Sequence, residues 1–229
     1  MPESKRATVS RVALLVPLGA IAFTVAWLVL GAVSPGYELF GNIIAPYSWI
    51  SQPVSGLGLG PTGPWMNAAF IVGGALVLAG TVSTAGAWRR QGGRGTTAFV
   101  LMALTGFGMI LCGSFTLESM MLHLLGFLLA VPLPAIGFLF AAAALRRTNG
   151  ALGRFALAGG VLTLVLFVIF MAIFDATGAG GNEGVAGLVQ RALIVAVLTT
   201  QSVLVVHVPR PSSVPDAAGL AGIDLPARY

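Results

Sequence analysis

The chain has 229 residues, of which 57% are hydrophobic and 8% are charged, whereas a soluble domain carries about 25% charged residues. This composition excludes an ordinary soluble protein and indicates an integral membrane protein with one domain. The net charge of +5 does not indicate a nucleic-acid partner, because the basic residues form short clusters between apolar runs, as cytoplasmic loops do.

The N-terminal tail, residues 1–11, is polar and basic, and an apolar run follows at 12–33. Because a membrane span needs about 20 residues, this run predicts an uncleaved helix. A signal peptide is the alternative, since Ala32 to Ser34 resembles a cleavage site, but the apolar core of a signal has only about 7–15 residues. Residues 34–63 lack Lys and Arg, and their stretch 43–57 is predicted to pack at the membrane interface or to fold back over the bundle as a cap.

Five further apolar runs predict the remaining spans. Pro132 and Pro134 lie inside the fourth of the six spans and should kink it. The C-terminal tail, residues 209–229, has no apolar run of spanning length and is predicted to be disordered. The sequence thus predicts an all-α transmembrane domain of residues 12–208, with spans at 12–33, 65–88, 96–115, 121–145, 155–174 and 185–208.

Charge is distributed unevenly among the loops. Apart from Arg191, every Lys and Arg lies in one of the two tails, in the 89–94 loop or in the 146–154 loop. The positive-inside rule therefore predicts that these segments and both termini are cytoplasmic, in a protein of the plasma membrane. The acids outside the tails all fall at the opposite, outer side; they are Glu38, Glu118, Asp175 and Glu183.

Arg191 lies inside the last apolar run, roughly 10 Å below its start. A cation in hydrocarbon costs about 2.5–3.5 kcal/mol on insertion scales, so this side chain must face protein, water or an anion. Asp175 or Glu118 could reach it across helices, whereas Glu183 is too many turns away on the same helix for an easy pair. Two interpretations remain: a buried ion pair that fixes helix packing, or an anchor for an anionic headgroup or a member of a proton relay.

His123 begins the fourth span five residues after Glu118. It is either a hydrogen-bonded structural group or a general acid or base beside a carboxylate. No metal is predicted, because His207 belongs on the other side of the membrane and a single cysteine, Cys112, cannot form a thiolate cluster. No cofactor is predicted either, because there is no P-loop or dinucleotide fingerprint, and no serine-nucleophile motif is present. Further ligand-binding candidates are Gln52, Asn67, Trp49, Gln190 and Glu183.

Three short motifs follow one another along the chain in an order that matches a known family. The motifs are Tyr47 to Gly58 with Asn67 and Gly73; Gly113, Ser114 and Phe115 with His123; and Gly184, Gly187, Leu188, Gln190 and Arg191. They resemble those of a bacterial membrane family known as domain of unknown function 998. The resemblance covers about residues 12–208 and implies six spanning helices with the motif residues on one face, without an established reaction.

The chain departs from that family pattern at two positions. Gly56 stands where an acid would follow Ser55, and Gln190 stands where an acid would precede Arg191. Both departures remove negative charge near Arg191. They shift its pairing onto the remaining acids, which are Glu118, Asp175 and Glu183.

The leading hypothesis is a six-helix bundle with a polar pocket open toward the outer leaflet. The pocket would bind or handle a membrane lipid or other amphiphilic small molecule, with Arg191 as anion anchor. The alternative is a membrane enzyme acting on a lipid or isoprenoid, with Glu118, Asp175 or His123 as acid or base, as carboxylic acids serve in membrane terpene cyclases. A small transporter is less favoured, because the sequence lacks paired half-helices and inverted repeats. The sequence leaves the ligand and the oligomeric state open.

Overall fold

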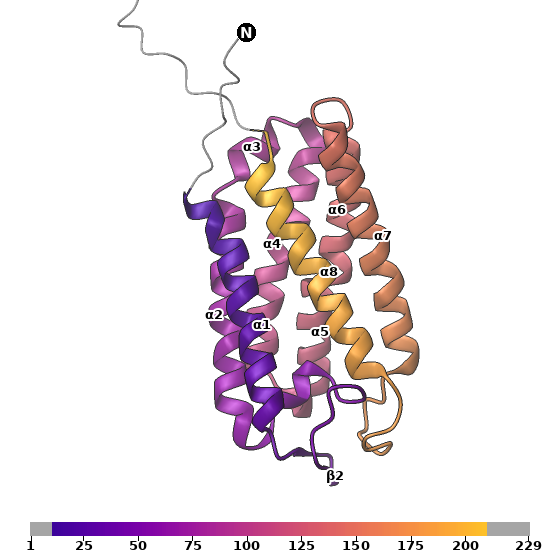
Figure 1. Cartoon of the computed structure of the whole chain (residues 1–229). Coiled ribbons are helices and arrows are strands. Elements are labelled where there is room, and N and C mark those ends of the chain that lie inside the picture. Colours follow the sequence, from indigo (N-terminus) through magenta and orange to yellow (C-terminus); the bar gives the residue numbers. More distant parts are fainter. Residues whose placement is uncertain (1–10, 210–229) are drawn as a thin grey trace, which may run out of the picture.

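A computed structural model describes residues 11–209 as a bundle of six helical spans that run up and down (Figure 1). Each span is long and apolar enough to cross a membrane, so the predicted six-helix membrane protein is confirmed. The predictions for the tails fall on residues 1–10 and 210–229, outside the described residues. The spans are η1–α1 (Arg11–Leu14, Leu15–Val33), η3–α2 (Gly60–Thr62, Gly63–Val82), α4 (Gly92–Ser114), η4–α5–α6 (Leu117–Ser119, Met120–Ala130, Pro132–Leu145), α7 (Gly150–Ile173) and α8 (Ala186–His207).

The two ends of the bundle differ in charge and in architecture. One end, called here the hairpin end, carries residues 34–62, 115–119 and 174–185 (Figure 1). All four acids in the described residues lie at this end and are exposed. The described basic residues other than Arg191 lie at the opposite end, in or beside the loops that join α2 to α4 and α6 to α7 and at the start of η1.

A short antiparallel hairpin interrupts the otherwise helical chain after α1. Strand β1 (Tyr37–Leu39) pairs with β2 (Asn42–Ile44) through a two-residue turn. Phe40 and Gly41 both adopt positive φ, at 51° and 84°, which is the backbone geometry that matches the right-handed twist of a tight hairpin. No strand was predicted here from the sequence. The alternation of β1 is visible in the structure, where Tyr37 and Leu39 are buried and Glu38 is exposed.

The second span was predicted to end at residue 88, but its helix ends six residues earlier. Helix α2 stops at Val82, and the separate short helix α3 (Ala85–Arg89) follows. Ser83 donates its hydroxyl to the carbonyl of Gly80 at 2.7 Å, and Thr84 does the same to Thr81 at 2.7 Å. Hydroxyl side chains that bond nearby carbonyls compete with the helix ladder, which explains the early end.

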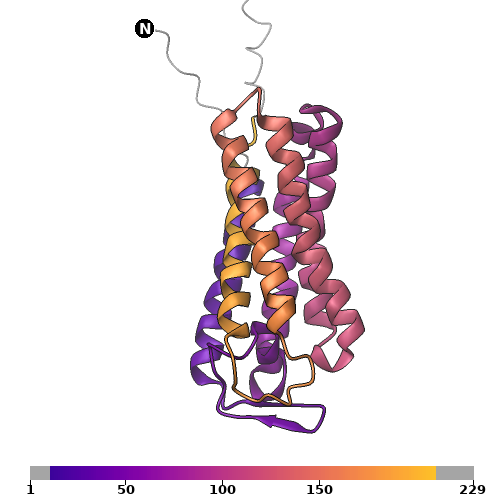
Figure 2. The same cartoon turned by 90° about the vertical axis from the view of Figure 1, so that its right-hand side faces the viewer.

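The predicted kink of the fourth span is confirmed. Val131 leaves helical geometry, with φ −123° and ψ −72°, and separates α5 from α6, which begins at Pro132. Beyond the kink, α6 packs along both α4 and α7, whereas α5 stays against α4 and diverges from α7 (Figure 2). On the α5 side of the kink, the backbones of α5 and α7 lie farther apart, and aromatic side chains of the two helices, Phe127 with Phe167 and Phe170, meet between them.

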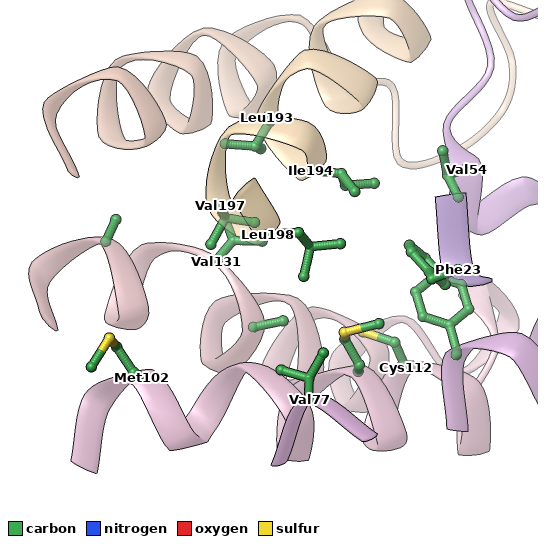
Figure 3. Packing of buried hydrophobic residues seen from close by; sticks show 14 of the residues in the cluster. Phe23, Val54, Val77, Met102, Cys112, Val131, Leu193, Ile194, Val197 and Leu198 are labelled. Atoms are coloured by element: carbon green, nitrogen blue, oxygen red, sulfur yellow. The ribbon is translucent and has the colours of Figure 1, made fainter. Parts of the chain in front are cut away.

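Helix α8 is the most buried of the six spans. Figure 3 shows Leu193, Ile194, Val197 and Leu198 of α8 facing the interior of the bundle. Farther along α8, the fully buried Gln201 donates to the Thr81 hydroxyl and to the Met102 carbonyl, each at 2.9 Å. It also accepts from the Thr105 hydroxyl at 2.5 Å. These bonds tie α8 to α2 and α4 in a setting where an unpaired amide would be costly.

Candidate functional site

The segment that connects the hairpin to α2 is inserted into the bundle. We call residues 47–59, which include the 3₁₀ turn η2 (Val54–Gly58), the docked segment. Every residue from Ser51 to Leu59 is buried. Of the two predicted arrangements, packing at the membrane interface or folding back over the bundle as a cap, this burial favours the second. A non-helical backbone at such depth needs internal partners for its polar groups, and several side chains and one helix end supply them.

The first turn of α8 supplies two of these partners. The amide of Gly187 donates to the carbonyl of Ser51 at 3.1 Å, and the amide of Leu188 donates to that of Ile50 at 2.9 Å. The first amides of a helix have no intrahelical acceptor, so both sides of the contact are satisfied at once. A Cβ on Gly187 would lie 2.2 Å from the carbonyl oxygen of Gln52. Only glycine allows the two backbones to approach this closely.

Arg191, one turn farther along α8, supplies more partners. Its Nη1 donates to three main-chain carbonyls, those of Trp49 at 2.8 Å, Gln52 at 2.9 Å and Gly187 at 2.9 Å. Its Nη2 donates to the hydroxyl of Tyr47 at 2.5 Å. The Nε–H alone has no partner in the described part of the chain. The guanidinium thus binds the docked segment to α8.

Three aromatic rings surround the same guanidinium. Its central carbon lies 5.3 Å from the ring centroid of Trp27, 5.7 Å from that of Tyr47 and 5.5 Å from that of Trp49. The negative face of an aromatic ring attracts a cation within about 6 Å, most strongly where water is excluded. Arg191 is only 6% exposed, so the rings replace the solvation that the cation has lost.

The prediction that carboxylates neutralise Arg191 is wrong. Its partners among residues 11–209 are carbonyl dipoles, one phenol and three π faces. Burial raises the pKa of the Tyr47 hydroxyl, although the charge of Arg191 and their hydrogen bond act in the opposite direction, so the phenol stays neutral. The acids remain in water because neutral dipoles already satisfy the cation and a buried carboxylate would need desolvation.

The predicted polar residues of the docked segment and its surroundings also hold the backbone. Gln52 accepts from the Tyr37 hydroxyl and donates to the carbonyl of Gly181, in the α7–α8 loop. Asn67 of α2 donates to the carbonyl of Gly58 at 3.1 Å. The indole of Trp49 donates to the carbonyl of Gly31 at 3.1 Å. Gln52, Asn67 and Trp49 therefore link the docked segment to its neighbours.

The structure does not bring the predicted acids to His123. Glu118 lines an open cleft of about 470 Å³ together with Glu38, and its carboxylate accepts from the Thr116 hydroxyl at 3.4 Å. Glu183 is exposed in the α7–α8 loop. Both ring nitrogens of His123 are bonded to other groups, described below, so no carboxylate in the described residues is its partner.

Asp175 organises the loop after α7. Its carboxylate accepts from the Thr177 amide at 2.9 Å, from the Thr177 hydroxyl at 2.6 Å and from the Gly180 amide at 2.8 Å. These bonds, led by that from Gly180, lower the pKa of Asp175. The ionised carboxylate therefore stabilises the folded loop fully at pH values above the pKa of Asp175 in the unfolded chain. This stabilisation is lost as the pH falls through the lower pKa of the folded state.

We expect Asp175→Asn to loosen this loop without unfolding the bundle. One amide oxygen accepts less than a carboxylate and carries no charge, so the Thr177 and Gly180 amides should exchange hydrogen faster at neutral pH. Hydrogen-exchange mass spectrometry of the peptide spanning 174–185 measures this. Glu183→Gln, at an exposed acid of the same loop, is the control and should leave the rates unchanged. Equal exchange in both variants would refute this role.

His123, Ser55 and Gln190 come together beside the docked segment. Nδ1 of His123 lies 2.7 Å from the carbonyl oxygen of Phe115, and Nε2 lies 2.9 Å from the hydroxyl of Ser55. Gln190 accepts the amide of Val54 through Oε1 at 2.6 Å. Gln190 is 3% exposed and lines the cavity described next.

These three side chains are the polar end of an apolar cavity. A cavity of about 120 Å³ lies between α5, α7, the start of α8 and the docked segment. A second one of about 40 Å³ continues toward the bundle core and shares Ser55, Phe127 and Gln190 with the first. The wall of the larger cavity consists mainly of apolar side chains: Pro53, Leu117, Met120, Leu124, Phe127, Phe170, Met171, Phe174 and Ala176.

The cavity lies where α5 faces α7. One of its lining residues, Met171 of α7, is 41% exposed. Beside the cavity, the ring of Phe127 in α5 packs against the rings of Phe167 and Phe170 in α7, at centroid distances of 5.9 and 5.4 Å.

Sequence reasoning missed Ser55 as a site residue. It lies 68 positions from His123, and nothing local marks one serine among many as the partner of that histidine. A signal was nevertheless present, because Ser55 and His123 belong to two of the three motifs that carry the family resemblance. The pocket itself differs from the predicted one: it is mostly apolar, and Arg191 is not among the residues that line it.

Comparison with known proteins gives a family but no function. Residues 17–207 match the family described as protein of unknown function (DUF998). No curated protein and no solved structure matches the chain.

Proposed function

We propose that this chain, which belongs to the DUF998 family of proteins of unknown function, binds a lipid or other amphiphile in the cavity between α5, α7 and α8. The observation that carries the proposal is the form of the cavity: apolar walls, a small polar end and an exposed lining residue, Met171. Ligand sites are typically apolar pockets with a few placed polar groups. An acyl or isoprenoid chain would occupy the apolar part, and its polar end would meet Ser55, His123 and Gln190.

The polar end favours an uncharged headgroup. Four hydrogen bonds and three rings already occupy Arg191, so it is not free to anchor an anion. Ser55, His123 and Gln190 instead offer hydroxyl, imidazole and carboxamide groups. Such groups recognise a hydroxyl, ester or amide of the ligand by hydrogen bonds.

The proposed orientation places the hairpin end outside the cell and both termini in the cytoplasm of a plasma-membrane protein. The separation of charges supports it, since Arg89, Arg90, Arg94, Arg146 and Arg147 flank one end of the bundle and cytoplasmic loops carry an excess of Lys and Arg. The ligand would then enter from the outer leaflet.

We expect Leu124→Trp to lower the amount of co-purified amphiphile by about tenfold, which corresponds to roughly 1.4 kcal/mol of binding free energy. Leu124 lines the cavity, so an indole there fills the space of the ligand. The matched control is Leu125→Trp, because Leu125 is 47% exposed on the adjacent surface. The measurement is quantitative mass spectrometry of lipids that remain on the purified protein. Equal retention in Leu124→Trp, Leu125→Trp and the wild type would rule the cavity out as the binding site.

A further inference from the structure

We infer that Ser55 is a nucleophile and His123 its general base, so that the cavity takes an amphiphile with a carboxylic ester at its polar end. The inference rests on the proposed binding function and adds a reaction to it. It is carried by the juxtaposition of Ser55 and His123 in the lining of one apolar cavity.

The hydrogen bonds fix the protonation pattern that a base requires. The carbonyl of Phe115 can only accept, so Nδ1 of His123 carries the proton and donates to it at 2.7 Å. Nε2 is then the lone-pair nitrogen, and the Ser55 hydroxyl donates to it at 2.9 Å. In hydrolytic triads a third group likewise holds the histidine in this tautomer. Here that group is a neutral carbonyl at the C-terminus of α4.

Gln190 is placed to stabilise the oxyanion that forms during attack. Its Oε1 is held by the amide of Val54, the residue before Ser55, at 2.6 Å. Gln190 lines the same cavity as Ser55, and because its Oε1 accepts from Val54, its Nε2–H₂ group is the donor that it can offer to a ligand. An amide donor aimed at a developing oxyanion is typical of acyl-transfer sites. A carboxylate at this position would lack such a donor.

The step is an ordinary acyl transfer. The Ser55 oxygen bonds to the ester carbonyl carbon while its proton passes to Nε2 of His123, and the carbonyl oxygen becomes the oxyanion. The carbon–oxygen bond to the leaving alcohol then breaks, and Nε2 returns the proton to that alcohol. Water, or a second alcohol in an exchange reaction, attacks the acyl-serine in the same way and regenerates the Ser55 hydroxyl.

The test is covalent labelling of the full-length protein in nanodiscs by a fluorophosphonate with an alkyl chain. We expect one label per chain at Ser55, located by peptide mass spectrometry, and labelling at least about tenfold slower in His123→Gln. Ser55→Ala should lose the label. Ser51→Ala is the matched control, because Ser51 is equally buried in the docked segment but bonds Asn182 instead of a histidine, and it should label as the wild type does.

The possible results separate the two proposals. Absence of label at Ser55 in the wild type overturns the assignment of Ser55 as nucleophile, whether or not any variant folds. Labelling of His123→Gln at the wild-type rate overturns the assignment of His123 as general base. Release of 4-nitrophenol from an octanoyl ester is measured in parallel, and a rate equal in wild type and Ser55→Ala also overturns the inference. If the protein retains an amphiphile but fails these tests, binding stands without the reaction. If Leu124→Trp also retains it, the proposed site fails as well.

Discussion

Replacing Arg191 by methionine should lower the free energy of unfolding by about 3–5 kcal/mol, because it removes buried hydrogen bonds to three carbonyls and one hydroxyl, and a hydrogen bond to a charged group contributes about 1.5–3 kcal/mol. For a chain of this size the loss corresponds to a fall of about 6–20 °C in Tm. Thermal unfolding in detergent measures it through tryptophan fluorescence, to which Trp27 and Trp49 beside the guanidinium contribute.

Arg191→Lys tests whether the stability depends on the positive charge of Arg191 or on the planar geometry of its guanidinium. An ammonium keeps the cation but cannot reproduce the planar fork that reaches three carbonyls and the Tyr47 hydroxyl. We expect it to recover less than half of the lost stability. The control is Arg147→Met, at an exposed arginine of the opposite end, which should leave Tm unchanged. An unfolding midpoint of Arg191→Met within about 2 °C of the wild type would contradict the role of Arg191 in holding the docked segment.

Gly187→Ala should destabilise the protein by about 3 kcal/mol, at the upper end of what overpacking usually costs. The added methyl would lie 2.2 Å from the carbonyl oxygen and 2.8 Å from the amide nitrogen of Gln52. Neither atom can rotate away as a side chain would, so the docked segment must separate from α8. The bonds between Ser51 and Gly187 and between Ile50 and Leu188 should then break.

The matched change for this prediction is Gly93→Ala. A Cβ at Gly93, in the first turn of α4, meets nothing within 4 Å, and alanine is the better helix former by up to about 1 kcal/mol. The variant should therefore be as stable as the wild type or slightly more so. Chemical denaturation of both variants in the same detergent compares them directly. If Gly187→Ala unfolds at the same denaturant concentration as Gly93→Ala, the contact between the docked segment and α8 does not require glycine at position 187.

The sequence predicted those parts of the structure that depend on hydrophobicity, on proline and on formal charge. Run length located the six spans, and the prolines located the break at Val131. The absence of Lys and Arg from residues 34–63, with their high Gly, Pro and aromatic content, indicated that this stretch is not a free loop, and nine successive residues of it are buried.

The partners of Arg191 were beyond the same reasoning. Formal charge points to acids as the partners of an arginine. Main-chain carbonyls occur at every residue, so residue types do not indicate which of them bond the guanidinium. Which carbonyls reach Arg191 depends on how residues 47–59 turn, and that depends on Gly187 and on contacts with other helices. For the same reason the pairing of Ser55 with His123 becomes visible only once three separate segments are placed together.

The dependence of the docked segment on α8 also constrains the order of assembly in the cell. Residues 47–59 are made early, yet their acceptors are matched by Gly187, Leu188 and Arg191, which are synthesised more than a hundred residues later. Until the final helix inserts, the early segment carries unmatched main-chain groups at the membrane surface. A chain that stops before α8 therefore lacks the donors of Gly187, Leu188 and Arg191 that the docked segment needs, however complete its first five spans are.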